Sequence, residues 1–235
     1  MHTPTNDVIE KVRSPYQLIE IARHPVFGNQ LLINGDLQIS ESDHSYNVAM
    51  TSPLIILGKW KRVAILGGGD GGVMKELLDI DRKQNRELEK ALMIDIDSEV
   101  IRLSKKYLPD LCGNAFEDPK SEVVIADVFE YLGDSEPFDA VIYDLTIDPV
   151  REEQTRREFL QELMEKVANA LHSNGMLNMQ CCGTQSYDQL TGVRREEIMN
   201  DIYSALKPFF SDFSEQQVFV PSFGEAWTFL SARKV

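Results

Sequence analysis

A short apolar run, Val63 to Leu66, leads directly into the run GGGDGG at residues 67–72, and this junction constrains the fold more than any other segment of the 235-residue chain. Gly67, Gly69 and Gly72 satisfy G-x-G-x-x-G between a predicted strand and a predicted helix, where glycine lets a nucleotide approach the backbone closely. A tight turn without a ligand is the simpler alternative. The acid inside the loop, Asp70, would repel an anionic ligand group and attract an ammonium.

Short apolar runs alternate with segments of helical periodicity from residue 61 onward. Such runs are typical of strands buried on both faces of a parallel sheet. The alternation predicts an α/β fold with a Rossmann-like doubly wound sheet. The five predicted strands are Val63–Leu66, Ala91–Ile94, Val123–Ala126, Ala140–Tyr143 and Met176–Met179, with helical periodicity at Val73–Leu78 and Val100–Leu108. Two later runs, Gln217–Val220 and Trp227–Ser231, predict an antiparallel pair that closes the sheet edge.

The N-terminal part has a different pattern. Two apolar-rich runs, Tyr16–Ala22 and Gln30–Ile33, are followed by Asn34-Gly35-Asp36, which predicts a β-hairpin with an Asn-Gly turn. Ser42 and Asp43 are candidate caps of a helix that passes through Tyr46 toward Leu54, unless Pro53 breaks it. We therefore expect a tail and small β-hairpin region over residues 1–50 and a Rossmann-like catalytic domain over residues 51–235.

Composition argues against several classes of function. The three cysteines, Cys112, Cys181 and Cys182, are an odd number without metal-ligand spacing, so we expect no disulfide framework, no metal site and a reducing, cytoplasmic setting. The formal net charge of −14 argues against nucleic acid as a partner, because phosphate binding needs clustered Lys and Arg. The charge fits either solubility or an environment that concentrates cations. No apolar run approaches the roughly 20 residues of a membrane span, so no membrane partner is expected.

Acids follow the predicted strands at the edge where an open α/β sheet binds ligands. Asp95 follows the second strand, where an acid commonly takes the hydroxyls of a ribose. Asp127 follows the third, where a carboxylate can accept from an adenine amino group while apolar neighbours pack on the ring. Capping of the next helix is the alternative role for either acid. The pair predicts a nucleoside site, and an acid after the third strand favours S-adenosyl ligands, as in the S-adenosylmethionine-dependent methyltransferase type of fold.

Asp70 distinguishes between two such ligands. S-adenosylmethionine has a carboxylate in its amino-acid tail, and a nearby loop carboxylate would repel it. Decarboxylation removes that group and leaves an ammonium with which Asp70 can pair. The competing hypothesis is a methyltransferase in which Asp70 binds the α-ammonium of the intact cofactor.

Asp144 follows the fourth predicted strand. Transfer of an alkyl group from a sulfonium to an amine requires a neutral amine, whereas a free alkylammonium has a pKa of about 10.4. Asp144, with a phenol such as that of Tyr46 from the preceding helix, is therefore predicted to orient the amine and accept its proton. A buried core tyrosine is the alternative for Tyr46.

Taken together, these motifs resemble the polyamine aminopropyltransferases, the spermidine and spermine synthase family. The matching segments extend over nearly the whole chain and are Ser14-Pro15-Tyr16-Gln17, Phe27-Gly28-Asn29, Gly35-Asp36-Leu37-Gln38, residues 67–72, Asp95-Ile96-Asp97 and Ser104-Lys105-Lys106-Tyr107. The spacing from Glu41 to Tyr46, the segment Asp144-Leu145-Thr146 and residues 220–227 are closer to the spermine synthase branch.

The resemblance implies that a polyamine amine attacks the aminopropyl carbon of decarboxylated S-adenosylmethionine, the co-substrate, and releases 5′-methylthioadenosine. Spermidine is the expected acceptor, and no metal or prosthetic group is implied. The implied catalytic residues are Asp144 and Tyr46, those that bind the nucleoside co-substrate are Gln17, Gly67, Gly69, Asp70, Asp95 and Asp127, and those that bind the amines are Asp70, Asp144 and Glu225. Asp148 is a further candidate for amine binding that the resemblance does not itself imply.

Several alternatives stay open. A spermidine synthase using putrescine, a thermospermine synthase, a methyltransferase and a non-catalytic polyamine-binding homologue are the competing functions. Asp148 lies where the spermine branch has no acid, so it binds an amine, caps the following helix or does neither, and Glu225 is alternatively a surface turn acid. We expect the chain to lack the large N-terminal dimerisation domain of animal spermine synthases and part of the N-terminal β-domain of spermidine synthases, which leaves a homodimer open.

Overall fold

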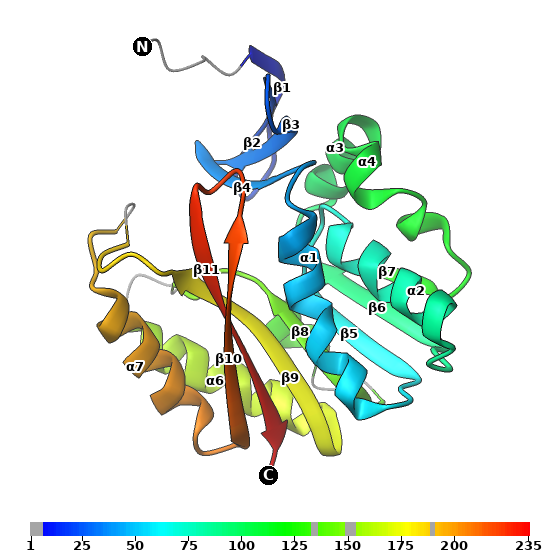
Figure 1. Ribbon diagram of the computed structural model, residues 1–235, viewed down its shortest axis with the longest axis vertical. Coiled ribbons are helices and arrows are strands. Elements are labelled where there is room, and N and C mark those ends of the chain that lie inside the picture. The colour runs from blue at the N-terminus through cyan, green and yellow to red at the C-terminus, as the bar shows by residue number, and fades with distance from the viewer. Residues whose placement is uncertain (1–6, 133–135, 149–153, 189–190) are drawn as a thin grey trace.

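The computed structural model describes residues 7–132, 136–148, 154–188 and 191–235, which form two sheets and their flanking helices (Figure 1). The larger sheet has the strand order β10-β11-β9-β8-β5-β6-β7. Its parallel strands are β5 (Arg62–Gly67), β6 (Lys90–Asp95), β7 (Ser121–Ile125), β8 (Phe138–Asp144) and β9 (Leu171–Gly183), and β10 (Phe210–Val220) and β11 (Glu225–Lys234) are antiparallel. Each of the five predicted parallel strands and the closing antiparallel pair is thereby confirmed.

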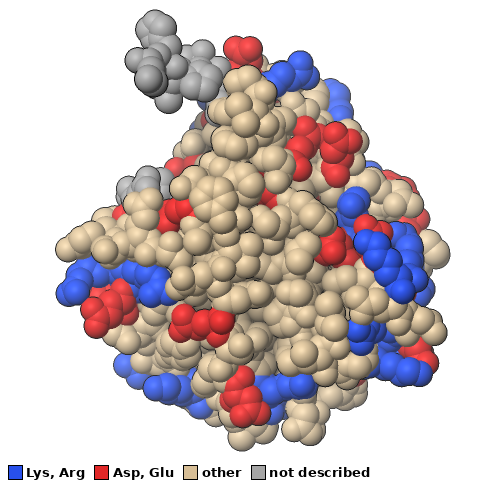
Figure 2. Space-filling view, in the orientation of Figure 1, with Lys and Arg blue, Asp and Glu red and all other residues tan. Residues whose placement is uncertain are grey.

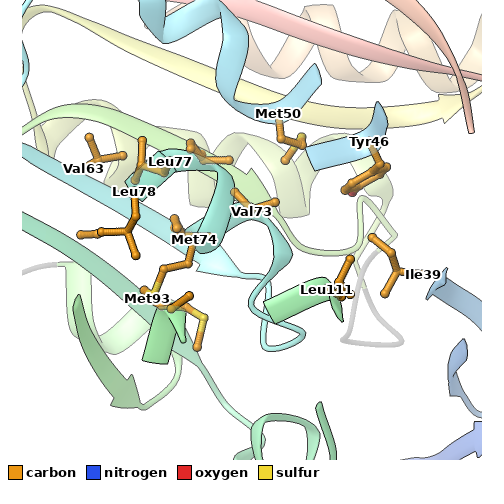
Figure 3. Packing of buried hydrophobic residues seen from close by; sticks show 14 of the residues in the cluster. Ile39, Tyr46, Met50, Val63, Val73, Met74, Leu77, Leu78, Met93 and Leu111 are labelled. Carbon is orange, nitrogen blue, oxygen red and sulfur yellow. The ribbon is translucent and has the colours of Figure 1, made fainter. Parts of the chain in front are cut away.

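Helices cover both faces of this sheet because side chains of a strand alternate between its faces. Val63 and Ile65 of β5 pack with one layer, and Ala64 and Leu66 with the other. The first layer contains α1 (His44–Thr51), α2 (Gly72–Gln84) and α3 (Ser98–Tyr107), with the short segments η1 (Ser52–Leu57), α4 (Pro109–Cys112) and η2 (Ala115–Glu117); the second contains α5 (Val128–Tyr131), α6 (Arg156–Asn169) and α7 (Arg195–Leu206). Figure 3 shows Met74 and Leu77 of α2 beside Val63 and Met93. The doubly wound α/β fold is confirmed.

The N-terminal region forms a four-stranded antiparallel sheet that extends the predicted hairpin. Its strands, in spatial order, are β1 (Asp7–Arg13), β2 (Leu18–His24), β3 (Gly28–Ile33) and β4 (Asp36–Ser40). Asn34 and Gly35, both with positive φ, form the tight turn between β3 and β4 as predicted. β1 lies within the expected tail. It is an edge strand with mostly exposed side chains, so it lacks the apolar alternation that marks a half-buried strand.

The start of α1 differs from expectation. Asp43 occupies the N-cap position, but its side chain makes no capping hydrogen bond, so its assignment as a side-chain cap is wrong. The fully buried carboxylate instead accepts hydrogen bonds from the amides of Ser40 and Ser222. Ser222, 179 residues away in the chain, thus takes the place of the helix amide that a side-chain cap would bind.

The end of α1 follows from Pro53. This residue has no N–H to donate to the carbonyl of Ala49, so the α-helix ends at Thr51 and continues as η1. The Ala49 carbonyl instead accepts from Asn178 Nδ2 at 3.1 Å and Gln216 Nε2 at 2.7 Å. Side chains of β9 and β10 thus hold α1 against the sheet.

Charges of both signs are interspersed around the border of the face drawn in Figure 2, and uncharged residues cover most of its centre, over β10 and β11. Within the described ranges, no helix has the length and apolar character needed to cross a membrane.

Candidate active site

The glycine loop at the end of β5 lets neighbouring acidic residues approach its backbone more closely than any residue with a side chain would allow. A Cβ at Gly67, where φ is +77°, would lie 2.4 Å from the Asp144 carbonyl oxygen. A Cβ at Gly69 would lie 2.6 Å from Asp95 Oδ2. Both contacts are too short for a side chain, so glycine at these positions is what lets β6 and β8 place their terminal acids against the loop.

Three carboxylates meet at this edge of the sheet because β5, β6 and β8 end in register. Asp70 is buried and accepts from the Gly72 amide at 2.8 Å. Asp95, half-buried, accepts from the Gly69 amide at 3.0 Å. Asp144, also half-buried, accepts from the Tyr46 hydroxyl at 2.5 Å. The sequence thus predicted correctly that these acids gather, although their roles stay predictions.

The cluster is strongly electronegative. No Lys, Arg or His of the described ranges forms an ion pair with Asp70, Asp95 or Asp144. Burial, and then repulsion from Asp144, raises the pKa of Asp70 to about 7. Burial also raises the pKa of Asp95 and of Asp144, although the Tyr46 hydrogen bond partly offsets the latter. A bound cation would relieve this unfavourable charge.

Tyr46 is a hydrogen-bond donor in this arrangement. Burial and the neighbouring Asp144 hold the pKa of the Tyr46 phenol well above its usual value, so it stays protonated at neutral pH. Its ring packs edge-on against Phe223 and Phe229, with centroids 6.2 Å and 5.2 Å away. Of this hydrogen-bonded pair, the Asp144 carboxylate is therefore the group able to accept a proton.

A series of aromatic and amide side chains leads from Tyr46 toward β11. Phe223 packs edge-on against Trp227 with centroids 5.1 Å apart. The Trp227 indole donates to Gln180 Oε1 at 2.9 Å, and Gln180 Nε2 donates to the Leu145 carbonyl at 2.7 Å. This chain of contacts connects the segment after Asp144 to β11.

The predicted nucleoside residues lie farther along the sheet. Asp127 accepts from the Phe129 amide at 2.8 Å and so caps α5. Exposed Ile96 and Ile125 lie next to the strand ends, and Ile125 is in register with Asp95. Gln17 does not bond Asp95 directly. It donates to Asp97 Oδ2 at 3.0 Å, and the amide of Asp97 donates to Asp95 at 2.9 Å.

The two remaining predicted residues differ in their surroundings. Asp148 accepts from Arg156 Nη2 at 2.6 Å and Nε at 3.1 Å, so its charge is already paired. Glu225 begins β11, next to Gly183, and accepts from the Gln185 amide at 3.2 Å. It belongs to a strand rather than to a turn.

No group of three or more His, Cys, Asp and Glu side chains suited to a metal ion occurs in the described part of the chain. The spermine/spermidine synthase domain family matches residues 43–235. The chain belongs to this family.

Relatives in the family are similar over nearly the full chain. A polyamine aminopropyltransferase 1 of Hyperthermus butylicus is 34% identical over 226 residues, which cover 94% of this chain and 73% of the relative. A spermidine synthase in complex with the transition state analogue AdoDATO has a TM-score of 0.81 at 25% identity, with 97% of this chain and 74% of that chain covered. The spermidine synthase of Thermotoga maritima has a TM-score of 0.80 at 26% identity, with coverages of 97% and 73%.

Sequence reasoning missed several residues of this family member's site. Asn47 is buried, its Oδ1 has no hydrogen-bond partner among the described residues, and its amide lies with Asp70 around Gly72. Its position directly after Tyr46 is the sequence signal that points to it. Asp97 stands out in the sequence only as part of the segment Asp95-Ile96-Asp97. Phe223 and Trp227 lie in the family-like segment 220–227, but nothing in the sequence indicates their contacts, and Gln180 carries no local signal, because these contacts join segments far apart in the chain.

The raised pKa of Asp70 predicts a pH-dependent stability of the ligand-free protein. The folded state holds a proton that the unfolded state releases above about pH 4, so stability falls as pH rises from about 4 to about 7. The Asp70→Asn variant keeps an acceptor for Gly72 and lacks this penalty. Its melting temperature should exceed that of the wild type at pH 8. The difference between variant and wild type should be about 5 °C larger at pH 8 than at pH 5. Thermal scans at both pH values test this, and a gap that does not widen with pH would contradict it.

Proposed function

We propose that this protein transfers the aminopropyl group of decarboxylated S-adenosylmethionine to an amine of a polyamine and releases 5′-methylthioadenosine. Membership of the spermine/spermidine synthase family and relatives named as polyamine aminopropyltransferases support this activity. The observation that carries it is the set of three carboxylates that have no cationic partner among the described residues, one of them bonded to Tyr46. Such a site favours cationic ligands, and both substrates are cations.

In the reaction, the lone pair of the amine attacks the aminopropyl carbon attached to the sulfonium. A C–N bond forms and the C–S bond breaks, with its electron pair going to sulfur to give a neutral thioether. Asp144 takes the proton of the amine, because Tyr46 keeps its own proton and holds the carboxylate at 2.5 Å. Positioning of the amine against the carbon is a second contribution of this pair.

Asp70 and Asn47 are proposed to bind the ammonium of the aminopropyl group. They adjoin each other at the start of α2. Asp70 adds charge, and the unpartnered Asn47 oxygen adds an acceptor that lacks a donor in the described chain. A carboxylate on the ligand at this place would meet like charge, which favours the decarboxylated co-substrate over the intact one.

Asp95 is proposed to bind the ribose and Asp127 the adenine amino group. Exposed Ile96 and Ile125 supply apolar area for the purine ring beside them. Gln17 acts on this site through Asp97, which also receives a hydrogen bond from Ser14 at 2.6 Å. The N-terminal sheet thereby supports the nucleoside end of the site.

Spermidine is the proposed acceptor, giving a spermine synthase-like reaction. Glu225, Trp227 and Phe229 share one face of β11, so Glu225 is about 13 Å along the strand from Phe229, one of the two rings that contact Tyr46. A carboxylate there suits the distal amine of a long acceptor. Asp148 is a weaker candidate for this role because Arg156 already pairs with it.

The Glu225→Gln variant tests the acceptor assignment. We expect its KM for spermidine to rise about 10-fold, because a hydrogen bond between charged groups is lost, whereas the KM for putrescine should stay within about twofold. Steady-state kinetics with each acceptor measure this, with Glu165→Gln on the exposed face of α6 as control. An equal effect on both acceptors would exclude a distal site at Glu225.

The activity itself is tested by incubating the protein with decarboxylated S-adenosylmethionine and either putrescine or spermidine. Chromatography should detect methylthioadenosine and identify the polyamine product, which also separates spermine from thermospermine. Absence of methylthioadenosine with every polyamine would refute the proposal.

We also propose a cytoplasmic setting. All three cysteines are free and buried, which fits a reducing compartment. A homodimer is compatible with this proposal, and sedimentation of the purified protein would test it.

A further inference from the structure

Asp43 is a fully buried carboxylate whose hydrogen-bond partners differ from those of the three active-site acids. Its Oδ2 accepts from the Ser40 amide at 2.7 Å and from the Ser222 hydroxyl, and its Oδ1 accepts from the Ser222 amide at 3.0 Å. No Lys, Arg or His in the described ranges pairs with it. A buried charge of this kind is tolerated only with such donors, and Ser222 supplies two of the three.

Ser222 lies in the tight turn that joins β10 to β11, residues 220–224. The amides of Phe223 and Gly224 both donate to the Val220 carbonyl at 3.2 Å, and Gly224 has a positive φ of 69°. These bonds hold the backbone of the turn that carries Phe223. That ring contacts both Tyr46 and Trp227.

A second contact holds the same segments together. The hydroxyl of Ser45 in α1 donates to the Phe219 carbonyl in β10 at 2.8 Å. The first turn of α1, which contains Tyr46, is thereby attached to the hairpin at two places. The Asp43 contact is the one that acts directly on the turn bearing Phe223.

We infer that Asp43 and Ser222 are positioning residues that set acceptor affinity, an inference that rests on the proposed function. By fixing the 220–224 turn against α1, they hold Phe223 beside Tyr46 and place the start of β11, including Glu225, at the acceptor end of the site. The nucleoside residues Asp95 and Asp127 follow β6 and β7, on the other side of β8 and β9 from β11. Loosening the turn should therefore weaken binding of the acceptor and leave binding of the nucleoside co-substrate unchanged.

The Ser222→Ala variant tests this through the two KM values. We expect the KM for spermidine to rise about 10-fold, the effect of losing a hydrogen bond to a charged group, and the KM for decarboxylated S-adenosylmethionine to stay within about twofold. Ser222→Thr, which keeps the hydroxyl, should restore the spermidine KM to within about threefold of the wild type. Asp43→Asn should show the same split in KM values if it folds. Ser214→Ala, at an exposed position of β10, is the control.

Unchanged KM values in Ser222→Ala, or an equal rise for both substrates, would overturn the inference, since a merely structural role lowers the melting temperature without separating the substrates. A Ser222→Thr variant as defective as Ser222→Ala would also overturn it. Failure of the proposed function looks different, because the wild type itself would then form no methylthioadenosine. Titration of the tryptophan fluorescence, to which Trp60 and Trp227 both contribute, with spermidine in the presence of methylthioadenosine gives an independent readout of acceptor affinity.

Discussion

The Asp144→Asn variant should lose about 10³-fold in kcat, while its affinity for methylthioadenosine stays within about threefold of the wild type. Asparagine retains an oxygen that can accept from the Tyr46 hydroxyl, so the packing around Tyr46 is expected to persist. What disappears is the group that takes the proton of the attacking amine. Methylthioadenosine release at saturating substrates measures kcat, and calorimetry measures binding.

Tyr46→Phe is the matched control for this result. It removes the donor that orients Asp144 and leaves the carboxylate in place, so a smaller loss of about 10-fold is expected. An Asp144→Asn variant with a nearly normal rate would remove Asp144 from the mechanism. Losses of equal size in the two variants would indicate that orientation, rather than proton transfer, accounts for the role of the pair.

The second large effect concerns the choice between intact and decarboxylated co-substrate. Replacing Asp70 by Asn should weaken binding of decarboxylated S-adenosylmethionine about 30-fold, because a charge-assisted hydrogen bond to the aminopropyl ammonium is lost. Binding of intact S-adenosylmethionine should not weaken, because the same change removes repulsion of its carboxylate. Calorimetry with both ligands gives the ratio of affinities.

The exposed Asp110→Asn variant, which also removes one negative charge, controls for the net charge of the protein. It should leave the ratio of affinities at the wild-type value. If Asp70→Asn kept that ratio as well, Asp70 would not be the residue that selects the decarboxylated form, and the methyltransferase hypothesis would regain weight.

Much of the fold could be predicted because its signals are local. The run Val63 to Leu66 is buried on both faces of the sheet, so every residue in it has to be apolar. β1 could not be predicted in the same way, because an edge strand with mostly exposed side chains has no such constraint. The four-stranded N-terminal sheet was for this reason expected only as a hairpin.

The candidate site could be predicted in part. Asp70, Asp95 and Asp144 follow strands whose carboxyl ends share one edge, so their proximity follows from the parallel topology. The assignment of Asp43 as a cap failed for the opposite reason. A local rule assigned its side chain to the first turn of the helix. The amide and the hydroxyl of Ser222, 179 residues away, donate to the buried carboxylate instead.

The amino-acid sequence by itself determined the alternation of strands and helices, the glycine loop and the edge at which the acids collect, because periodicity and strand direction follow from chain geometry. Only the tertiary structure decided which partner each polar group has: Ser222 for Asp43, Arg156 for Asp148, and Asn178 for the carbonyl that Pro53 leaves without a donor. Hydrogen bonds need atoms within about 3 Å in a narrow range of angles, and packing of distant segments sets those positions.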